Sequence, residues 1–334
     1  MNKQTFTYNQ AFQLESGKTL PQLEIAYHTY GTLNSDKSNV VWFCHALTAN
    51  SDVMDWWNVV CGEGKTFDPK KHFIVCANII GSCYGSSGPL SINPETKKPY
   101  YSNFPSVTIR DMVNAHIILR KQLGIEKINT IMGGSMGGYQ ILEWVVQEPQ
   151  VFDKMILLTT SPQESAWGIG IHTAQRLAIE TDKSWNEPRP DAGAQGLKTA
   201  RAIGMLTYRS YESFVKAQTD EEHKLDNSKA SSYIHYQGDK LVKRFNAYSY
   251  WLLTKSLDSH NIARNREKME NVLKSIKTKS LIIGITTDML CPIAEQKFMA
   301  QHIPNSKFVQ IDSLYGHDGF LIEGKKISEA IAKF

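Results

Sequence analysis

Residues 131–145 read I-M-G-G-S-M-G-G-Y-Q-I-L-E-W-V, and this stretch decides how the chain folds. Its residues 133–137, G-G-S-M-G, fit the G-x-S-x-G pattern of a serine held at a sharp turn between a strand and a helix. Apolar residues 128–132 precede the serine as a buried strand would, and an amphipathic helical pattern follows over residues 140–147. The stretch therefore predicts a strand, a tight turn that exposes the Ser135 hydroxyl, and a helix.

The residue types around Ser135 suit a nucleophile. Glycines flank it because larger side chains would collide with the adjacent strand and helix, and because the turn needs unusual backbone angles. Unpaired N–H groups at the start of the helix would favour a negatively charged oxygen nearby. A glycine-rich structural turn is the alternative interpretation, but the strand and helix on either side favour the nucleophile.

The composition is ordinary for a soluble globular protein. The chain has 334 residues, of which 41% are hydrophobic and 21% charged, so it can bury a sizeable core. Its net charge of +4 is spread along the sequence without the basic and aromatic clusters of nucleic-acid-binding proteins. We therefore expect no nucleic acid among its partners.

The sequence gives no sign of secretion, a membrane or a metal. The five cysteines have no framework spacing and form no C-x-x-C pair, so neither a disulfide scaffold nor a zinc site is expected. Residues 1–10 are polar and unlike a signal peptide, and no apolar run approaches membrane-spanning length. These features predict a cytoplasmic protein without a membrane segment.

Strand and helix patterns alternate through most of the chain. Residues 23–27 alternate apolar and polar side chains, and Thr108 with Asp111 resembles a capping box at the start of a helix. Further strand signals occur at residues 39–45, 72–80, 127–132, 154–160, 279–286 and 307–311. Helical patterns occur between and after them, at residues 108–124, 136–148, 292–302 and 324–334. This alternation predicts an α/β protein with a mostly parallel, doubly wound sheet.

Residues 161–266 interrupt the alternation. They carry helical and aromatic-rich patterns but no strong strand signal. We interpret them as a helical cap (lid) inserted between two core strands, so that residues 1–160 and 267–334 form the core domain. With the serine turn, this organisation predicts the α/β-hydrolase fold, with the cap above the nucleophile.

A serine hydroxyl needs a base to accept its proton and an acid to orient that base. In the α/β-hydrolase fold the chain order is serine, then Asp or Glu, then His. Asp288 directly follows the strand predicted at residues 279–286, and His317 lies in the loop after the last strand. We therefore predict Ser135, Asp288 and His317 as the catalytic residues. The alternative for Asp288 is a cap of the helix that begins near Pro292.

The same fold predicts an oxyanion hole made of two backbone amides. One is the N–H of Met136, which follows the nucleophile, and the other is the N–H of Leu47, in the loop after an early strand. Removing one donor of this kind typically lowers turnover by about 10²–10³. His45, at the end of that strand, is interpreted as structural.

The chain resembles the homoserine O-acetyltransferase family, the acyl-transferring branch of the α/β-hydrolases. The resemblance runs from end to end and includes H-A-L-T at residues 45–48, N-I-I-G-S-C-Y-G-S-S-G-P at 78–89, the serine turn with L-E-W at 142–144, and G-H-D at 316–318. It implies an enzyme of methionine biosynthesis that moves an acetyl group from acetyl-CoA to L-homoserine by a ping-pong mechanism. It implies no metal, no tightly bound cofactor and a homodimer formed through the cap.

The resemblance also implies which residues bind the amino-acid acceptor. Arg201 and Tyr208 match the family residues that hold its carboxylate, and Asp318 matches the residue that faces its ammonium group. Arg201 and Tyr208 are seven residues apart, so on a continuous helix they share one face. An arginine can grip a carboxylate with two hydrogen bonds. Without the resemblance, a solvated helix arginine would be the simpler interpretation of Arg201.

Two positions depart from the family pattern and leave alternatives open. Tyr139 stands where Met is common, and Gly319 stands where Ala is common. Succinyl-CoA as donor and L-serine as acceptor therefore stay open. So does a serine esterase or thioesterase, which would use the same triad with water as acceptor. A non-enzymatic binding protein is a further alternative, against which the complete Ser, Asp and His set argues.

Overall fold

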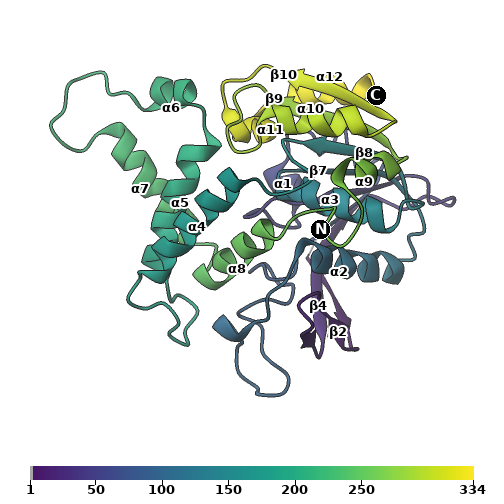
Figure 1. Ribbon diagram of the computed structural model, residues 1–334, viewed down its shortest axis with the longest axis horizontal. Helices are drawn as coiled ribbons and strands as arrows, with labels where there is room; N and C mark the ends of the chain where they lie inside the picture. Colours follow the sequence, from purple (N-terminus) through teal and green to yellow (C-terminus); the bar gives the residue numbers. More distant parts are fainter. Residues whose placement is uncertain (1–2) are drawn as a thin grey trace.

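A mixed sheet forms the centre of the structure, a computed structural model that describes residues 3–334 (Figure 1). Within these residues the main sheet has eight strands in the order β1-β4-β6-β5-β7-β8-β9-β10. The strands are β1 (Gln4–Tyr8), β4 (Leu23–Tyr30), β5 (Val40–Cys44), β6 (Phe73–Ala77), β7 (Ile128–Gly134), β8 (Phe152–Leu158), β9 (Lys279–Ile285) and β10 (Ser306–Ile311). Strands β5 to β10 run parallel and β4 is antiparallel to both of its neighbours, which confirms the predicted sheet.

Side chains of the central strands point alternately to the two faces of the sheet. In β5, Val40, Trp42 and Cys44 join the core on one face, whereas Val41 and Phe43 join the core on the other. The first face is covered by α2 (Ile109–Gln122), α3 (Met136–Gln147), α9 (Met269–Ser275) and α10 (Ile293–His302), and the second by α1 (Val53–Trp56), α11 (Gly319–Ile322) and α12 (Gly324–Ala332). Burial on both faces explains the continuous apolar sequence of this strand.

The capping box predicted at the start of α2 is present. The Thr108 hydroxyl accepts a hydrogen bond from the Asp111 backbone N–H, and the Asp111 carboxylate accepts one from the Thr108 N–H at 2.8 Å. An aspartate thus serves in place of the usual glutamate. The arrangement fixes where α2 begins on the face of the sheet.

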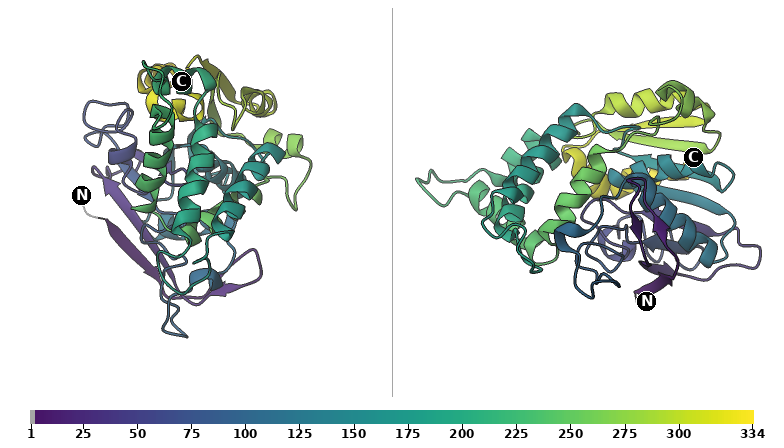
Figure 2. Two further views of the ribbon diagram at one scale, coloured as in Figure 1. Left: turned by 90° about the vertical axis from the view of Figure 1, so that its left-hand side faces the viewer. Right: turned by 60° about the horizontal axis from the view of Figure 1, so that its bottom comes forward.

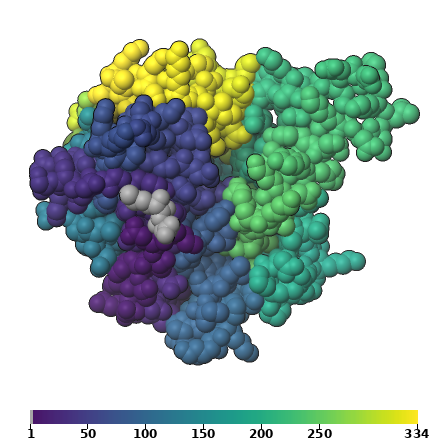
Figure 3. Space-filling model, turned by 180° about the vertical axis from the view of Figure 1, so that it is seen from behind, coloured from purple at the N-terminus to yellow at the C-terminus, as the bar shows by residue number. Residues whose placement is uncertain are grey.

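A helical cap projects from one side of the core (Figures 1 and 2). Its helices lie between β8 and β9 in the sequence and are α4 (Ala166–Glu180), α5 (Ala194–Tyr208), α6 (Tyr211–Gln218), α7 (Lys229–Val242) and α8 (Ala247–Asp258). Helix α5 packs against α4 and α7, and α4 also packs against α8. Seen from behind, the cap forms a mass beside the core (Figure 3). The division into core and cap domains at residues 160 and 266 stays a prediction.

The chain enters and leaves the cap at one place. The N–H of Glu164 donates to the carbonyl of His260 at 2.9 Å, and the N–H of Ile262 donates to the carbonyl of Pro162 at 3.1 Å. Gln163 and Asn261 form an antiparallel bridge between these two segments. We call residues 162–164 and 260–262 the clasp, because they join the two ends of the insertion.

Short elements and strand ends are where sequence and structure differ. Strand β1, the hairpin of β2 (Phe12–Gln13) and β3 (Thr19–Leu20), and helices α1, α9 and α11 were not predicted, because such short segments show no clear period. Strand β8 ends at Leu158 and not at residue 160, because Thr159 has a φ of 42° and turns the chain towards the cap. Among residues 3–334, every helix is too short or too polar to cross a membrane.

Candidate active site

Ser135 occupies a strained turn between β7 and α3. Its φ of 55° and ψ of −128° lie outside the regions that non-glycine residues normally adopt. The turn is held by two hydrogen bonds: the Ser135 N–H donates to the Leu158 carbonyl at 3.0 Å, and the Thr160 hydroxyl donates to the Ser135 carbonyl at 2.9 Å. Strain of this kind persists only where the surroundings fix it, and it is common at catalytic residues.

Gly137 brings the start of α3 against the loop after β5. A β-carbon at this position would lie 2.1 Å from the carbonyl oxygen of Cys44, so only glycine allows this approach. The side-chain amide of Gln140 also donates to the His45 carbonyl at 3.0 Å and ties the same helix to the same loop. The G-x-S-x-G pattern therefore serves the close packing of α3 as well as the turn.

Asp288 and His317 meet at the carboxyl ends of β9 and β10. The Nδ1 of His317 lies 2.8 Å from the Oδ2 of Asp288, and both residues are buried. The other oxygen of Asp288 accepts hydrogen bonds from the N–H groups of Leu290 and Cys291 at 2.8 and 2.9 Å. Helix α10 has Pro292 at its N-cap, so the Asp288 carboxylate binds the preceding turn and not the helix start.

The pairing with Asp288 sets the basicity of His317. Burial by itself would lower the pKa of His317, but the adjacent Asp288 carboxylate outweighs it and raises the pKa above the ordinary value of 6.5. Since Nδ1 faces Asp288, Nε2 is the nitrogen left to exchange a proton with another group. This is the arrangement of a general base oriented by an acid.

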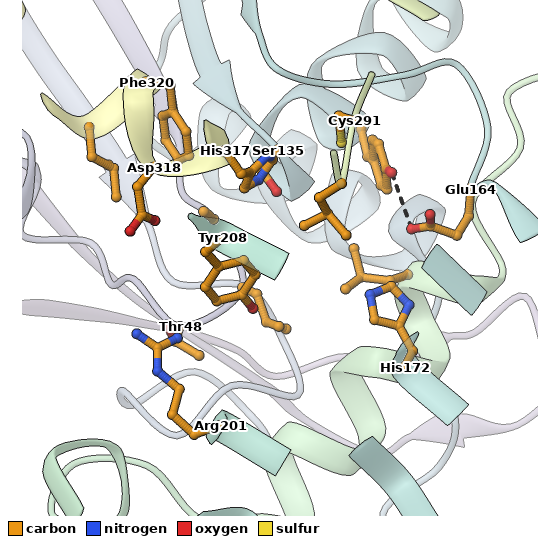
Figure 4. Close-up of a pocket in the computed structure, with 16 residues that line it drawn as sticks. Thr48, Ser135, Glu164, His172, Arg201, Tyr208, Cys291, His317, Asp318 and Phe320 are labelled. Atoms are coloured by element: carbon orange, nitrogen blue, oxygen red, sulfur yellow. Dashed lines mark hydrogen bonds between the residues drawn. The ribbon is translucent and has the colours of Figure 1, made fainter. Parts of the chain in front are cut away.

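Ser135 and His317 line the same small cavity, which has a volume of about 110 Å³. In the view of Figure 4 the two side chains overlap near the centre of the residues that line this cavity. The cavity lies below the cap and is lined by residues of both core and cap. The structure thus brings together the three residues predicted as the triad, although they are far apart in the sequence.

The loop after β5 forms another part of the wall of the cavity that contains Ser135 and His317. Ala46, Leu47 and Thr48 line the cavity, and hydrogen bonds of the His45 ring hold the start of this loop. The Nε2 of His45 accepts a hydrogen bond from the Ile79 N–H at 3.1 Å, so its Nδ1 carries the proton that is donated to the Ala46 carbonyl at 2.8 Å. His45 is fully buried and its pKa is lowered to about 4 by burial, in keeping with a structural role.

The two backbone amides predicted as the oxyanion hole are available. Among residues 3–334, the N–H groups of Leu47 and Met136 donate to no protein acceptor. Met136 begins α3, so its N–H is also at the positive end of that helix. Leu47 lines the cavity that contains Ser135.

The predicted acceptor residues line one side of the cavity. The guanidinium carbon of Arg201 lies 5.3 Å from the centre of the Tyr208 ring, as expected for two residues on one face of α5. Asp318, next to His317, lines the cavity as well. Its carboxylate forms an ion pair with Arg209 at 3.0 Å, a partner that the sequence reasoning missed.

The opposite side of the cavity was not predicted, apart from Tyr139. It includes Glu164 and His172, which come from the segment entering the cap and from α4, and Cys291, which follows β9 (Figure 4). The Tyr139 hydroxyl donates to Glu164 at 3.1 Å. A lone glutamate after a strand or a histidine on a helix is common at surfaces, so the sequence alone does not single these residues out.

Two residues of the predicted triad and the neighbouring Cys291 form a buried group of side chains that could bind a metal ion. Possible ligand atoms of Asp288, Cys291 and His317 lie within 4.8 Å of one another. An ion on the Asp288 carboxylate and the His317 ring would compete with the 2.8 Å hydrogen bond between them. The geometry therefore favours the hydrogen-bonded pair.

The chain resembles named proteins over its whole length. A family model described as alpha/beta hydrolase fold matches residues 39–323. The homoserine O-acetyltransferase of Cyclobacterium marinum is 46% identical over 334 residues, which cover 100% of this chain and 95% of that protein. The homoserine O-acetyltransferase of Chlorobaculum parvum is 44% identical over 326 residues, which cover 97% of this chain and 92% of the relative.

Solved structures agree with the fold. The homoserine O-acetyltransferase of Staphylococcus aureus superposes with a TM-score of 0.83 at 30% identity, covering 100% of this chain and 95% of that chain. Esterase E22 superposes with a TM-score of 0.89 at 24% identity, covering 99% of each chain. The likeness to the esterase is one of fold alone, and it shows that the same scaffold also carries proteins named as ester hydrolases.

Proposed function

Because this chain belongs to the homoserine O-acetyltransferase family of α/β-hydrolase enzymes, we propose that it moves an acetyl group from acetyl-CoA to the hydroxyl of L-homoserine in two half-reactions at Ser135. The chain is an acyltransferase. The donor, the ping-pong order and the roles of the individual residues are part of the proposal. The observation that carries them is the strained Ser135 in one cavity with a His317 whose Nδ1 is bound to Asp288.

In the first half-reaction Ser135 is acetylated. The Ser135 Oγ gives its proton to the Nε2 of His317 and attacks the thioester carbon, while the carbonyl oxygen becomes an oxyanion held by the N–H groups of Leu47 and Met136. The C–S bond then breaks, and His317 returns the proton to the departing sulfur. The products are free CoA and acetyl-Ser135.

In the second half-reaction the acceptor removes the acetyl group. The homoserine hydroxyl gives its proton to His317 and attacks the acetyl carbon, and the same two amides hold the oxyanion. The bond from Ser135 Oγ then breaks, and His317 returns the proton to the serine. O-acetylhomoserine leaves and the enzyme is restored without a metal or a tightly bound cofactor.

The acceptor is positioned by its two charged groups. Arg201, beside Tyr208, is placed to bind the carboxylate of homoserine, and Asp318 is placed to face its ammonium. L-serine carries the same groups one methylene closer to its hydroxyl, so this arrangement also has to fix the distance between the groups and acetyl-Ser135. A cavity of about 110 Å³ suits a small substrate.

A thiol-release assay tests the proposal. It crosses acetyl-CoA and succinyl-CoA with homoserine and serine, and mass spectrometry identifies the product. We expect thiol release from acetyl-CoA that depends on homoserine, with O-acetylhomoserine as product. Equal thiol release with and without homoserine would instead identify a thioesterase. Failure of a serine-directed phosphonate to label Ser135 would favour a protein without catalytic activity.

Arg201→Ala separates acceptor binding from acylation. We expect this variant to need far more homoserine while p-nitrophenyl acetate still acetylates Ser135 at a normal rate. Loss of acylation with unchanged homoserine affinity would show that Arg201 has been assigned to the wrong half-reaction. Ser135→Ala serves as the control that abolishes both steps.

We also propose a homodimer formed through the cap. Large apolar side chains are exposed on the cap helices, among them Trp167, Leu177, Leu206 and Tyr211 at 54%, 55%, 58% and 78%. A surface of this kind suits a protein partner. Light scattering should give the mass of a dimer for the wild type and of a monomer for Leu177→Asp; a monomeric wild type would contradict the proposal.

A further inference from the structure

The cavity has two chemically different sides around Ser135. Arg201, Tyr208 and Asp318 lie on one side, and Glu164 and His172 lie on the other (Figure 4). The proposed function gives the first side to the amino-acid acceptor. The second side is then the space for the acyl group carried by Ser135.

Tyr139 connects Ser135 to this second side. Tyr139 lies in the first turn of α3 and lines the same cavity as Ser135. The ring stacks on His260 with centroids 3.9 Å apart and planes 10° apart. Because its hydroxyl donates to Glu164 at 3.1 Å, Tyr139 is fixed at both the ring and the tip.

Glu164 is held in place at both carboxylate oxygens. Oε2 accepts the hydrogen bond from Tyr139, and Oε1 accepts one from the N–H of Ser165 at 3.0 Å. A β-carbon on Gly168 would lie 2.0 Å from Oε1, so the carboxylate depends on glycine at that position. Burial raises the pKa of Glu164, and the nearby His172 together with these hydrogen bonds opposes that rise.

This side of the cavity offers acceptors and apolar surface to a bound acyl group. The Tyr139 hydroxyl donates its hydrogen bond to Glu164, and the Nδ1 of His172 is paired with Asp258 at 2.9 Å. Neither this hydroxyl nor this nitrogen is therefore free to donate to an acyl group. Cys291 lies on this side (Figure 4), and Leu257 and Leu290 are among the apolar residues that line the cavity. A methyl group fits such surroundings, whereas a second carboxylate would lose water and lie next to the negatively charged Glu164 carboxylate.

We propose that Glu164, fixed by Tyr139, is a specificity-determining residue that admits the acetyl group and excludes acyl groups ending in a carboxylate, such as succinyl. This inference rests on the proposed function, because it assumes that the acyl group on Ser135 turns towards Tyr139. It explains donor choice by one buried acidic side chain. It also gives a role to Tyr139, one of the two residues that depart from the family pattern.

The test compares the two CoA donors in four proteins: the wild type, Glu164→Gln, Tyr139→Phe and Glu295→Gln. Glu164→Gln keeps the shape of the side chain and removes its charge, and Tyr139→Phe keeps the ring and removes the hydrogen bond. Glu295 is a second acid near Glu164 but does not line the cavity, so its variant is the matched control. The quantity measured is the ratio of kcat/KM for acetyl-CoA to kcat/KM for succinyl-CoA with homoserine saturating.

We expect a strong acetyl preference in the wild type and in Glu295→Gln. Glu164→Gln should lower the ratio by about tenfold or more, because it removes the repulsion between two like charges in a desolvated site. Tyr139→Phe should lower it less, since Glu164 keeps its charge but loses one anchor. Should Glu164→Gln fail to fold, as judged by circular dichroism, Tyr139→Phe carries the test.

A second readout needs neither CoA nor homoserine. Acylation of Ser135 by p-nitrophenyl acetate and by mono-p-nitrophenyl succinate is followed through nitrophenolate release and the mass of the acyl-enzyme. If the wild type releases no thiol from acetyl-CoA with homoserine, the proposed function fails, yet this readout still measures acyl preference. A wild type that accepts the succinyl ester as readily as the acetyl ester overturns the inference.

Two further results would overturn the inference while leaving the proposed function intact. One is an unchanged donor ratio in Glu164→Gln in an enzyme that uses acetyl-CoA and homoserine. The other is a raised KM for homoserine in Glu164→Gln with the donor ratio unchanged, which would place Glu164 against the ammonium group of the acceptor.

Discussion

Arg209 forms an ion pair with Asp318, the residue that follows His317, with 3.0 Å between Nε and Oδ2. Arg209 directly follows α5, which carries Arg201 and Tyr208, whereas Asp318 belongs to the core segment that carries His317. Burial raises the pKa of Asp318, and the charges of Arg209 and then His317 oppose it. The pair therefore fixes the cap to the core at the place where the acceptor is proposed to bind.

Arg209→Ala should weaken use of the acceptor. Without the guanidinium, the buried Asp318 carboxyl is more readily protonated and less well placed for an ammonium group, so we expect the KM for homoserine to rise by about tenfold. Acylation by p-nitrophenyl acetate should change little, and Arg209→Lys should recover part of the loss. A normal KM for homoserine in the alanine variant would contradict this role.

The backbone strain at Ser135 should be measurable as a difference in the free energy of unfolding between two variants at this position. Its φ of 55° suits glycine better than any residue with a β-carbon. We expect Ser135→Gly to unfold at higher urea concentration than Ser135→Ala, with a free energy of unfolding larger by about 1 kcal/mol after the greater chain entropy of glycine is subtracted. Both variants should be inactive, so the comparison isolates the backbone. An alanine variant at least as stable as the glycine variant would show that the turn is not strained.

The pH dependence of acylation should report the Asp288–His317 pair. His317 is a base only when neutral, and its pKa is raised above 6.5, so the rate should fall as the pH drops through a midpoint above 6.5. Asp288→Asn removes the negative charge that raises the pKa of His317. Burial, which lowers this pKa, is then no longer opposed by that charge, so the midpoint should move to lower pH. The maximal rate should fall by about 10⁴ as well. The same midpoint in both proteins would rule out Asp288 as the residue that sets the basicity of His317.

Glu295 should make the protein less stable as the pH rises. Burial and the charge of Glu164 raise the pKa of Glu295 from 4.5 to about 7, so between these values the folded protein holds a proton that the unfolded chain releases. The free energy of unfolding contributed by this group is therefore lost as the pH rises from 4.5 to 7. Because the side chain is partly exposed, we expect a modest effect, about 1 kcal/mol.

Glu295→Gln removes this titration. Relative to the wild type, the variant should gain about 1 kcal/mol in free energy of unfolding at pH 8 and almost nothing at pH 4. Urea unfolding of both proteins at the two pH values measures the difference. A gain that is the same at both pH values would mean that the glutamate does not titrate in this interval.

The core of the fold could be predicted because its sequence signals are local. The apolar run of β5, the capping box at Thr108 and the glycines around Ser135 each reflect contacts within one element or with its immediate neighbours. Once these elements are placed in a parallel sheet, the ends of β9 and β10 must lie near the end of β7. That topology predicts Asp288 and His317 beside Ser135.

The remaining parts of the site depend on contacts between distant segments. Glu164 lies in the segment that enters the cap, and its position follows from Tyr139 on α3 and from Gly168 on α4. Arg209 is placed by the docking of α5 against the loop after β10. Neither Glu164 nor Arg209 belongs to a sequence motif or a periodic pattern. Their neighbours are brought together only when the cap packs against the core.

The clasp at residues 162–164 and 260–262 includes Glu164, which is proposed to select the acyl donor, whereas Arg201 and Tyr208, which are proposed to bind the acceptor, lie in the helices beyond it. Since both ends of the insertion leave the core together, evolution can exchange the helices beyond them for others without rearranging the sheet. Such an exchange would remove Arg201 and Tyr208. Glu164 and His260 belong to the clasp and would stay. The proposed roles thus predict that changing the cap helices alters the acceptor, while Glu164 keeps its part in choosing the acyl donor as long as Gly168 on α4 is retained.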